Sequence, residues 1–275
     1  MGILTNPYSF VSSSPGGGGV PTDGLVGRFM GGEGITLDTT AGRDSVSTWV
    51  NQVDGATWDL TQTTKSLQPS YDSGNELVQY NGTYYNVFPG DILAYNANWT
   101  VVFITDVITG NWWTMLGAAN AFGYIKPNIN NSLVFFRMDN FAYWYPPYDS
   151  TASPLTNANF NVVGMSYPGA ETGAGPSNIN NFACISNQYL FTADPDTDPS
   201  LSASFTAPVS YRPITAVSNL NSGGANTNGI AQDIKEILFY DKQLDQSEAT
   251  DIYDYADALV TLNVLPDDMD YYGSP

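Results

Sequence analysis

Residues 230–256, IAQDIKEILFYDKQLDQSEATDIYDYA, decide the fold, because they place an apolar strand directly before an amphipathic helix. The segment IKEILFY (234–240) has the length and the aromatic and β-branched content of a buried strand. Asp245 and Glu248 have the spacing of a capping box, which predicts that a helix begins after Asp245. Apolar residues then recur at helical spacing on one face, namely Ala249, Ile252, Tyr253, Ala256, Leu259 and Val260.

Five further apolar segments of strand length precede this unit. They are WTVVFIT (99–105), LVFFRM (133–138), FNVVGMSY (160–167), FACIS (182–186) and QYLF (188–191). Several of them lack clean alternation, which is typical of strands that are covered on both faces. Many short strands separated by Gly, Asn, Asp and Pro predict an all-β fold, a two-sheet antiparallel jelly-roll sandwich with one short C-terminal helix.

The composition excludes several classes of function. The chain has 275 residues and a net charge of 8 − 27 = −19, which repels nucleic acid and anionic membranes, so neither is an expected partner. It has no histidine, which excludes the usual triads and zinc sites. Its single cysteine, Cys184, lies in apolar surroundings and is expected to be buried in a strand. We expect no signal peptide and no transmembrane segment.

Two segments resemble concanavalin A-like, laminin-G-like jelly rolls. The first, residues 42–87, contains Trp49, Asn51, Gln52, Gly55, Pro69, Tyr71, Tyr80, Asn81 and Gly82 in the order typical of the family's opening strands. The second resembles the family's closing strand and short helix through Asp233, Ile234, Glu236, Tyr240, Asp241, Leu244 and Glu248. The resemblance implies that Trp49 and Trp58 lie inside the sandwich. Gly82 is expected in a turn with positive φ, and Glu236 is expected to accept hydrogen bonds from buried backbone or tyrosine groups rather than to do chemistry.

The sequence predicts three regions. Residues 1–22 form an N-terminal arm with a Gly-rich linker, residues 23–264 form the jelly-roll domain, and residues 265–275 form an acidic tail. The arm carries four large apolar residues, so we expect it to dock on a partner, and the alternative is a disordered tail. Those docking residues are Ile3, Leu4, Tyr8 and Phe10. Such an arm ahead of a laminin-G-like domain resembles structural proteins of tailed bacteriophages.

No catalytic motif is visible. Concanavalin A-like glucanases carry E-x-D-x-x-E or E-x-D-x-E on one strand, and this sequence has neither pattern. An enzyme would need a carboxylate pair assembled from distant segments. Asp194, Asp196 and Asp198 are spaced like the start of a calcium loop but lack its glycine and final glutamate. They are predicted to form a solvated turn, with weak calcium binding as the alternative, so no cofactor and no metal site are predicted.

Two aromatic clusters are candidates for glycan or protein contact, since flat rings on loops stack on sugars or anchor interfaces. They comprise Trp112, Trp113, Tyr143, Trp144, Tyr145 and Tyr148. The alternative is that they fill the core.

These observations together favour a non-enzymatic virion structural protein, made in the host cytoplasm. Its predicted partners are neighbouring capsid or tail subunits and host-surface glycans, and a homo-oligomer is an alternative to a monomer. A free-standing carbohydrate-binding lectin is the second hypothesis, and a glycoside hydrolase is the third.

Overall fold

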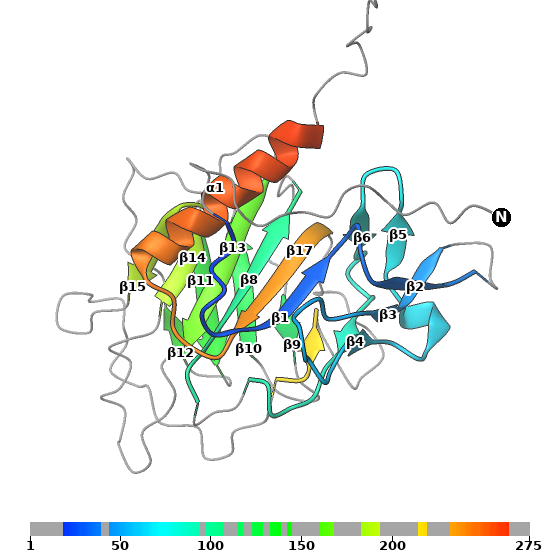
Figure 1. The fold of residues 1–275 in the computed structure, drawn as a ribbon. Coiled ribbons are helices and arrows are strands. Elements are labelled where there is room, and N and C mark those ends of the chain that lie inside the picture. The colour runs from blue at the N-terminus through cyan, green and yellow to red at the C-terminus, as the bar shows by residue number, and fades with distance from the viewer. Residues whose placement is uncertain are drawn as a thin grey trace, which may run out of the picture.

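The computed structural model describes residues 19–39, 44–93, 97–106, 115–117, 123–128, 133–138, 142–144, 160–167, 183–192, 214–218 and 232–263. The fold is mostly antiparallel β-sheet with one C-terminal helix, as an all-β sandwich requires (Figure 1). This confirms the predicted fold class. Among these residues, no helix is long and apolar enough to cross a membrane.

The helix α1 (Gln246–Asn263) packs against one layer of strands. In order across that layer these are β15 (Tyr189–Thr192), β14 (Ala183–Ser186), β13 (Asn161–Tyr167), β8 (Trp99–Thr105), β17 (Asp233–Tyr240) and β1 (Leu25–Met30). Strand β8 is buried along its whole length, and so is β13 between its neighbours β8 and β14. This double coverage explains why their sequences do not alternate.

The sheet continues from β17 around the side of the sandwich. The first part of β17 pairs with β6 (Leu77–Gln79), and β6 pairs with β5 (Ser70–Asp72). The path then runs through β3 (Ser45–Trp49), β4 (Leu60–Thr61), β7 (Asn86–Val87), β16 (Ala216–Val217) and β9 (Leu116–Gly117), with β2 (Ile35–Asp38) beside β3. A short 3-10 helix, η1 (Lys65–Leu67), precedes β5. This path brings the start of β17 beside the hairpin of β5 and β6.

A second sheet of three strands lies behind β13 and β14 in Figure 1. It consists of β10 (Gly123–Asn128), β11 (Leu133–Met138) and β12 (Ala142–Trp144), all antiparallel. The predicted strand 133–138 matches β11.

The main core lies between the layers and is rich in aromatic rings. Phe29 meets Trp49 at a ring-centroid distance of 6.0 Å and Phe239 at 5.8 Å, both edge to face. Trp58 packs on Phe29 and Phe239, each at 5.2 Å. Trp49 is fully buried and Trp58 partly so, as the sequence predicted. Edge-to-face contacts of this kind each contribute about 0.5–1.5 kcal/mol beyond the burial itself.

A second apolar cluster holds the helix on the sheet. Helix α1 (Gln246–Asn263) buries Ala249, Ile252 and Ala256 against β8, β13 and β17. The capping box is present, because Glu248 N donates to Asp245 Oδ1 (2.9 Å) and Asp245 N donates to Glu248 Oε2 (3.0 Å). Both the start of the helix and its buried face were therefore predicted correctly from local sequence.

Two smaller predictions are also confirmed. Cys184 is fully buried in β14, and burial raises the pKa of its thiol. Gly82 has φ 87°, in the left-handed region that favours glycine.

Candidate active site

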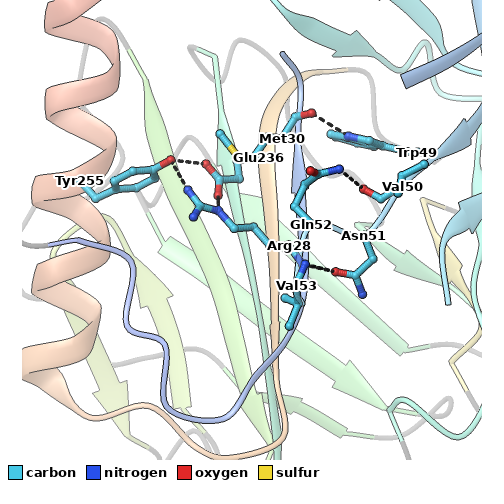
Figure 2. Close-up of polar contacts among 9 residues, drawn as sticks. All are labelled: Arg28, Met30, Trp49, Val50, Asn51, Gln52, Val53, Glu236 and Tyr255. Atoms are coloured by element: carbon cyan, nitrogen blue, oxygen red, sulfur yellow. Dashed lines mark hydrogen bonds and ion pairs between the residues drawn. The ribbon is translucent and has the colours of Figure 1, made fainter. Parts of the chain in front are cut away.

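A buried ion pair joins the sheet to α1, as Figure 2 shows. Glu236 points from β17 toward the helix, and its side chain is 1% exposed. Arg28 Nε on β1 donates to Glu236 Oε1 (2.7 Å), and Tyr255 Oη on α1 donates to Glu236 Oε2 (2.8 Å). Arg28 Nη2 in turn donates to Tyr255 Oη (2.7 Å). We call these three residues the polar clamp.

The clamp is structural rather than reactive. Burial raises the pKa of Glu236, and the charge of Arg28 and the Tyr255 hydrogen bond offset part of that rise. Burial also raises the pKa of Tyr255. A carboxylate that is almost completely buried cannot meet a substrate. Of the donors predicted for Glu236, buried backbone or tyrosine groups, the tyrosine is present, and Arg28 was not predicted.

The side of β1 opposite β17 is closed by the side chain of Asn51 (Figure 2). Its Oδ1 accepts from the backbone N of Arg28 (3.0 Å) and of Val53 (3.1 Å), and its Nδ2 donates to Val26 O (3.0 Å). Gln52 N also donates to Arg28 O (2.8 Å). These bonds replace a neighbouring strand and fix β1, and with it Arg28.

Carboxylates from separate parts of the chain meet where β17 begins. Asp106 N donates to Asp233 O (2.9 Å), which extends the β8–β17 ladder beyond the pair Thr105 and Ile234. On the other side of Asp233, Gln79 of β6 donates from Nε2 to Asp233 Oδ2 (2.9 Å). Asp72, at the end of β5, pairs with Leu77 at the turn end of the β5–β6 hairpin, whereas Gln79 pairs with Ser70 at the other end, so Asp72 acts on Asp233 through its charge. We call Asp72, Gln79, Asp106 and Asp233 the acidic corner.

The carboxylates of the acidic corner differ in proton affinity. Desolvation raises the pKa of the half-buried Asp233, the Gln79 hydrogen bond offsets part of that rise, and the charges of Asp106 and Asp72 add to it. The pKa of Asp72 is lowered, first by its hydrogen bond from Asn75 and then by that from Gly74 N. The carboxyl group of Asp233 therefore binds its proton more tightly, and that of Asp72 less tightly, than an ordinary aspartate does.

The acidic corner is accessible. Asp106 is exposed, and Asp72, Gln79 and Asp233 are only partly buried. Within the described residues, no group of His, Cys, Asp and Glu has the arrangement to hold a metal ion. The corner can therefore donate a proton and accept hydrogen bonds from hydroxyl groups.

Most of the sequence-predicted site residues lie outside the described residues. This holds for the arm residues, the suggested calcium loop and four of the six aromatic candidates: Ile3, Leu4, Tyr8, Phe10, Asp194, Asp196, Asp198, Trp112, Trp113, Tyr145 and Tyr148. Tyr143 and Trp144 belong to β12, next to β11.

Sequence reasoning missed Asp106 and Asp233 as a pair. Each directly flanks a recognisable strand, Asp106 after WTVVFIT and Asp233 before IKEILFY. Polar residues at strand ends were the available signal. The missing information was that these two strands are antiparallel neighbours.

No family model and no curated protein matches the sequence. Among solved structures, a GH54 α-L-arabinofuranosidase soaked with a cyclic sulfate inhibitor superposes with a TM-score of 0.51 at 12% identity, covering 84% of this chain and 62% of that one. The Trypanosoma rangeli sialidase gives 0.48 at 12% identity, covering 90% and 34%. Domain 4 of AbnA, a GH43 arabinanase from Geobacillus stearothermophilus in complex with arabinotriose, gives 0.46 at 14% identity, covering 83% and 98%.

These likenesses concern the fold. The chain spans about a third of the length of the sialidase, so the similarity is to one part of that protein. The arabinofuranosidase, with the highest TM-score of the three, is a glycoside hydrolase that shares the β-sheet fold. The likeness therefore supports the β-sheet fold that the concanavalin A-like resemblance implied, and it supports neither the laminin-G-like family nor a phage origin.

The comparisons correct the predicted function. We expected a non-enzymatic virion structural protein, and that prediction is wrong, because the structure that superposes with a TM-score above 0.5 is a glycoside hydrolase rather than a virion protein. The prediction that the chain is not an enzyme is contradicted by the same finding. The error arose because the sequence shows no family motif for a catalytic pair, whereas carboxylates from separate strands are brought together only by the fold.

Proposed function

We propose that this chain is a carbohydrate-active domain that hydrolyses glycosidic bonds at the acidic corner. The observation that carries the proposal is the pairing of Asp233, whose pKa is raised by burial and by its acidic neighbours, with the exposed Asp106. The fold is shared with a GH54 α-L-arabinofuranosidase, which makes a furanoside or other glycoside the first substrate class to test.

The roles follow from the environments of the two carboxyl groups. Asp233 holds its proton to higher pH and serves as the general acid, which protonates the leaving glycosidic oxygen as the C–O bond breaks. Asp106 is the second carboxylate. Its backbone N donates to Asp233 O (2.9 Å), so the two residues are adjacent across the ladder, and we assign them the retaining mechanism, in which the two carboxyl groups stand roughly 5 Å apart. Asp106 then attacks the anomeric carbon, and water, activated by the Asp233 carboxylate, releases the sugar.

Gln79 is the positioning residue of this arrangement. Its amide fixes Asp233 Oδ2 and leaves Oδ1 to carry the proton.

Glycan binding without cleavage is the second candidate. Carboxylate and amide groups gathered at an accessible sheet corner are suited to hydrogen bonds with sugar hydroxyls, whether or not a bond is broken.

The test uses the full chain and a panel of aryl glycosides that includes an α-L-arabinofuranoside. The measured quantity is aglycone release by the wild type, Asp233→Asn, Asp106→Asn and, as a matched control at an exposed turn, Asp91→Asn. We expect each corner variant to lose roughly 10²–10⁴-fold in rate while circular dichroism stays unchanged, and the control to keep wild-type activity. Binding of oligosaccharides by the wild type without cleavage would establish the second candidate. Absence of both binding and cleavage across a broad glycan panel would refute the carbohydrate proposal.

A further inference from the structure

The chain carries the acceptor pattern of N-linked glycosylation, Asn-x-Ser/Thr, at three places. These are Asn81-Gly82-Thr83, Asn98-Trp99-Thr100 and Asn130-Asn131-Ser132, of which the third lies outside the described residues. We propose that Asn81 is an acceptor site for a sugar in the folded protein and that Asn98 is not. This inference is independent of the proposed hydrolysis, because the modification uses no catalytic group of this chain.

The two residues that define the first motif are accessible in the turn after β6. Asn81 and Thr83 are exposed, whereas Gly82 between them is buried and has no side chain to be recognised. A glycosyltransferase recognises the asparagine amide and the hydroxyl of the third residue. Both groups can therefore be reached while the turn stays folded.

The side chain of Asn81 is held by Thr83. Asn81 Oδ1 accepts from Thr83 Oγ1 (2.7 Å) and from Thr83 N (3.1 Å). The bond to the backbone N two residues on closes an Asx turn, which fixes the orientation of the amide. Among the residues that the structure describes, Asn81 Nδ2 has no hydrogen-bond partner, so the nitrogen that would receive the sugar is not engaged.

Sugar transfer makes that nitrogen the nucleophile. A bond forms between Asn81 Nδ2 and the anomeric carbon of a nucleotide-activated sugar, and the bond from that carbon to the phosphate oxygen breaks. The nucleoside diphosphate leaves with the electron pair, and the amide proton passes to a base of the transferase. Because negative charge spreads onto Oδ1 as the proton departs, the two Thr83 donors stabilise it as the donors of an oxyanion hole do.

The motif at Asn98 differs because its hydroxyl is buried and bonded elsewhere. Asn98 is exposed, but Trp99 and Thr100 are fully buried in β8. Thr100 Oγ1 donates to Lys242 O (2.7 Å) and lies 2.8 Å from Ser166 Oγ, with which it shares a hydrogen bond. An enzyme reaches this hydroxyl only when β8 opens, so the fold separates two motifs that look equivalent in the sequence.

The experiment incubates the purified, folded chain with a soluble N-glycosyltransferase and UDP-glucose, and peptide mass spectrometry locates each added hexose. Synthetic peptides 77–87 and 94–104 report the preference of the enzyme for the two motifs outside the fold. Thr83→Val removes the hydroxyl, whereas the matched control Thr83→Ser keeps it. Circular dichroism and urea unfolding verify that both variants are folded.

We expect Asn81 in the folded protein to be modified within a few-fold of the rate of its peptide. Modification of Asn98 should fall roughly 100-fold or more below that of its own peptide, because it proceeds only in molecules in which β8 is locally open. Thr83→Val should lose most of the modification at Asn81, and Thr83→Ser should retain it.

Three outcomes overturn the proposal. One is an Asn81 that is suppressed in the folded protein as strongly as Asn98, which would mean that the turn is closed to the enzyme. Another is a folded protein in which Asn98 reacts as fast as its peptide, which would mean that burial of Thr100 gives no protection. The third is a Thr83→Val variant that is modified as fast as the wild type, which would mean that the hydroxyl takes no part.

Discussion

Arg28 and Glu236 are 208 residues apart and form a 2.7 Å ion pair in which the carboxylate is almost completely buried. Removal of the arginine would leave that buried carboxylate with the hydrogen bond from Tyr255 and without its countercharge. We therefore expect Arg28→Met to lower the free energy of unfolding by about 3 kcal/mol at neutral pH. Urea unfolding measures it, and the double variant Arg28→Met with Glu236→Leu should recover most of the loss. A loss of equal size in the double variant would show that the arginine acts by packing alone.

The raised pKa of Glu236 predicts a pH dependence with a definite sign. Because its pKa in the folded protein lies above the ordinary value of 4.5, the native state binds the proton more tightly than the unfolded chain does. The associated stability is fully present below the unfolded pKa and is lost as the pH rises through the folded pKa. Relative to Glu236→Gln, the wild type should lose stability over that window in urea unfolding. If the free energies of unfolding of the wild type and Glu236→Gln run parallel over this pH range, the pKa of Glu236 is not raised in the folded protein.

Contacts between residues close in the sequence could be predicted from it, whereas contacts between distant segments could not. The capping box of Asp245 and Glu248 spans three residues, so its spacing is visible in the sequence and its geometry follows from the helix. The burial of Glu236 and its tyrosine partner followed from an apolar strand that needed a donor. Arg28 could not be identified, because nothing local to it records that β1 lies beside β17.

The acidic corner shows the same limit at the candidate site. Asp106 and Asp233 are adjacent only because β8 and β17 are antiparallel neighbours in a register that ends at Thr105 and Ile234. Strand existence is encoded in local apolar content, whereas strand order depends on the packing of the whole sandwich. The sequence therefore shows both aspartates, but it does not show that Asp106 and Asp233 are neighbours in the sheet.

If Asp233 is the general acid, Gln79 should set the alkaline limb of the activity profile. The Gln79 hydrogen bond lowers the pKa of Asp233, so Gln79→Leu should raise it further. An acid acts only while protonated, and the rate falls as the pH passes its pKa, so the limb should move to higher pH in the variant. The measurement is kcat/KM against pH with the aryl glycoside that the wild type cleaves. If kcat/KM drops equally at every pH and its alkaline limb does not move, Gln79 has a purely structural role.

Gly31 leaves room for a backbone crossing that a methyl group would block. A Cβ at residue 31 would lie 1.9 Å from Glu76 O and 3.1 Å from Lys235 O, and both atoms belong to the main chain. We expect Gly31→Ala to lower the free energy of unfolding by about 3 kcal/mol or more. Gly55→Ala is the matched control, since its Cβ would meet open space and only its φ of 78° is strained, at about 1 kcal/mol. If both variants lose the same free energy of unfolding, the main chain around Gly31 shifts to make room for the methyl group.

Gln246, the first residue of α1, closes the outer edge of β15. Leu190 N donates to Gln246 Oε1 (3.0 Å), and Gln246 Nε2 donates to Gln188 O (2.6 Å), so one side-chain amide satisfies a donor of the edge strand and an acceptor of the turn before it. Exposed edges with free backbone groups pair readily with other chains, and proteins cover them to avoid aggregation.

We expect Gln246→Ala to leave the free energy of unfolding within about 1 kcal/mol of the wild type. The same variant should form higher oligomers at concentrations where the wild type does not. Light scattering after size-exclusion chromatography detects them, with the neighbouring exposed Ser247→Ala as control, and a variant that keeps the wild-type mass at every concentration would show that the amide does not protect this edge.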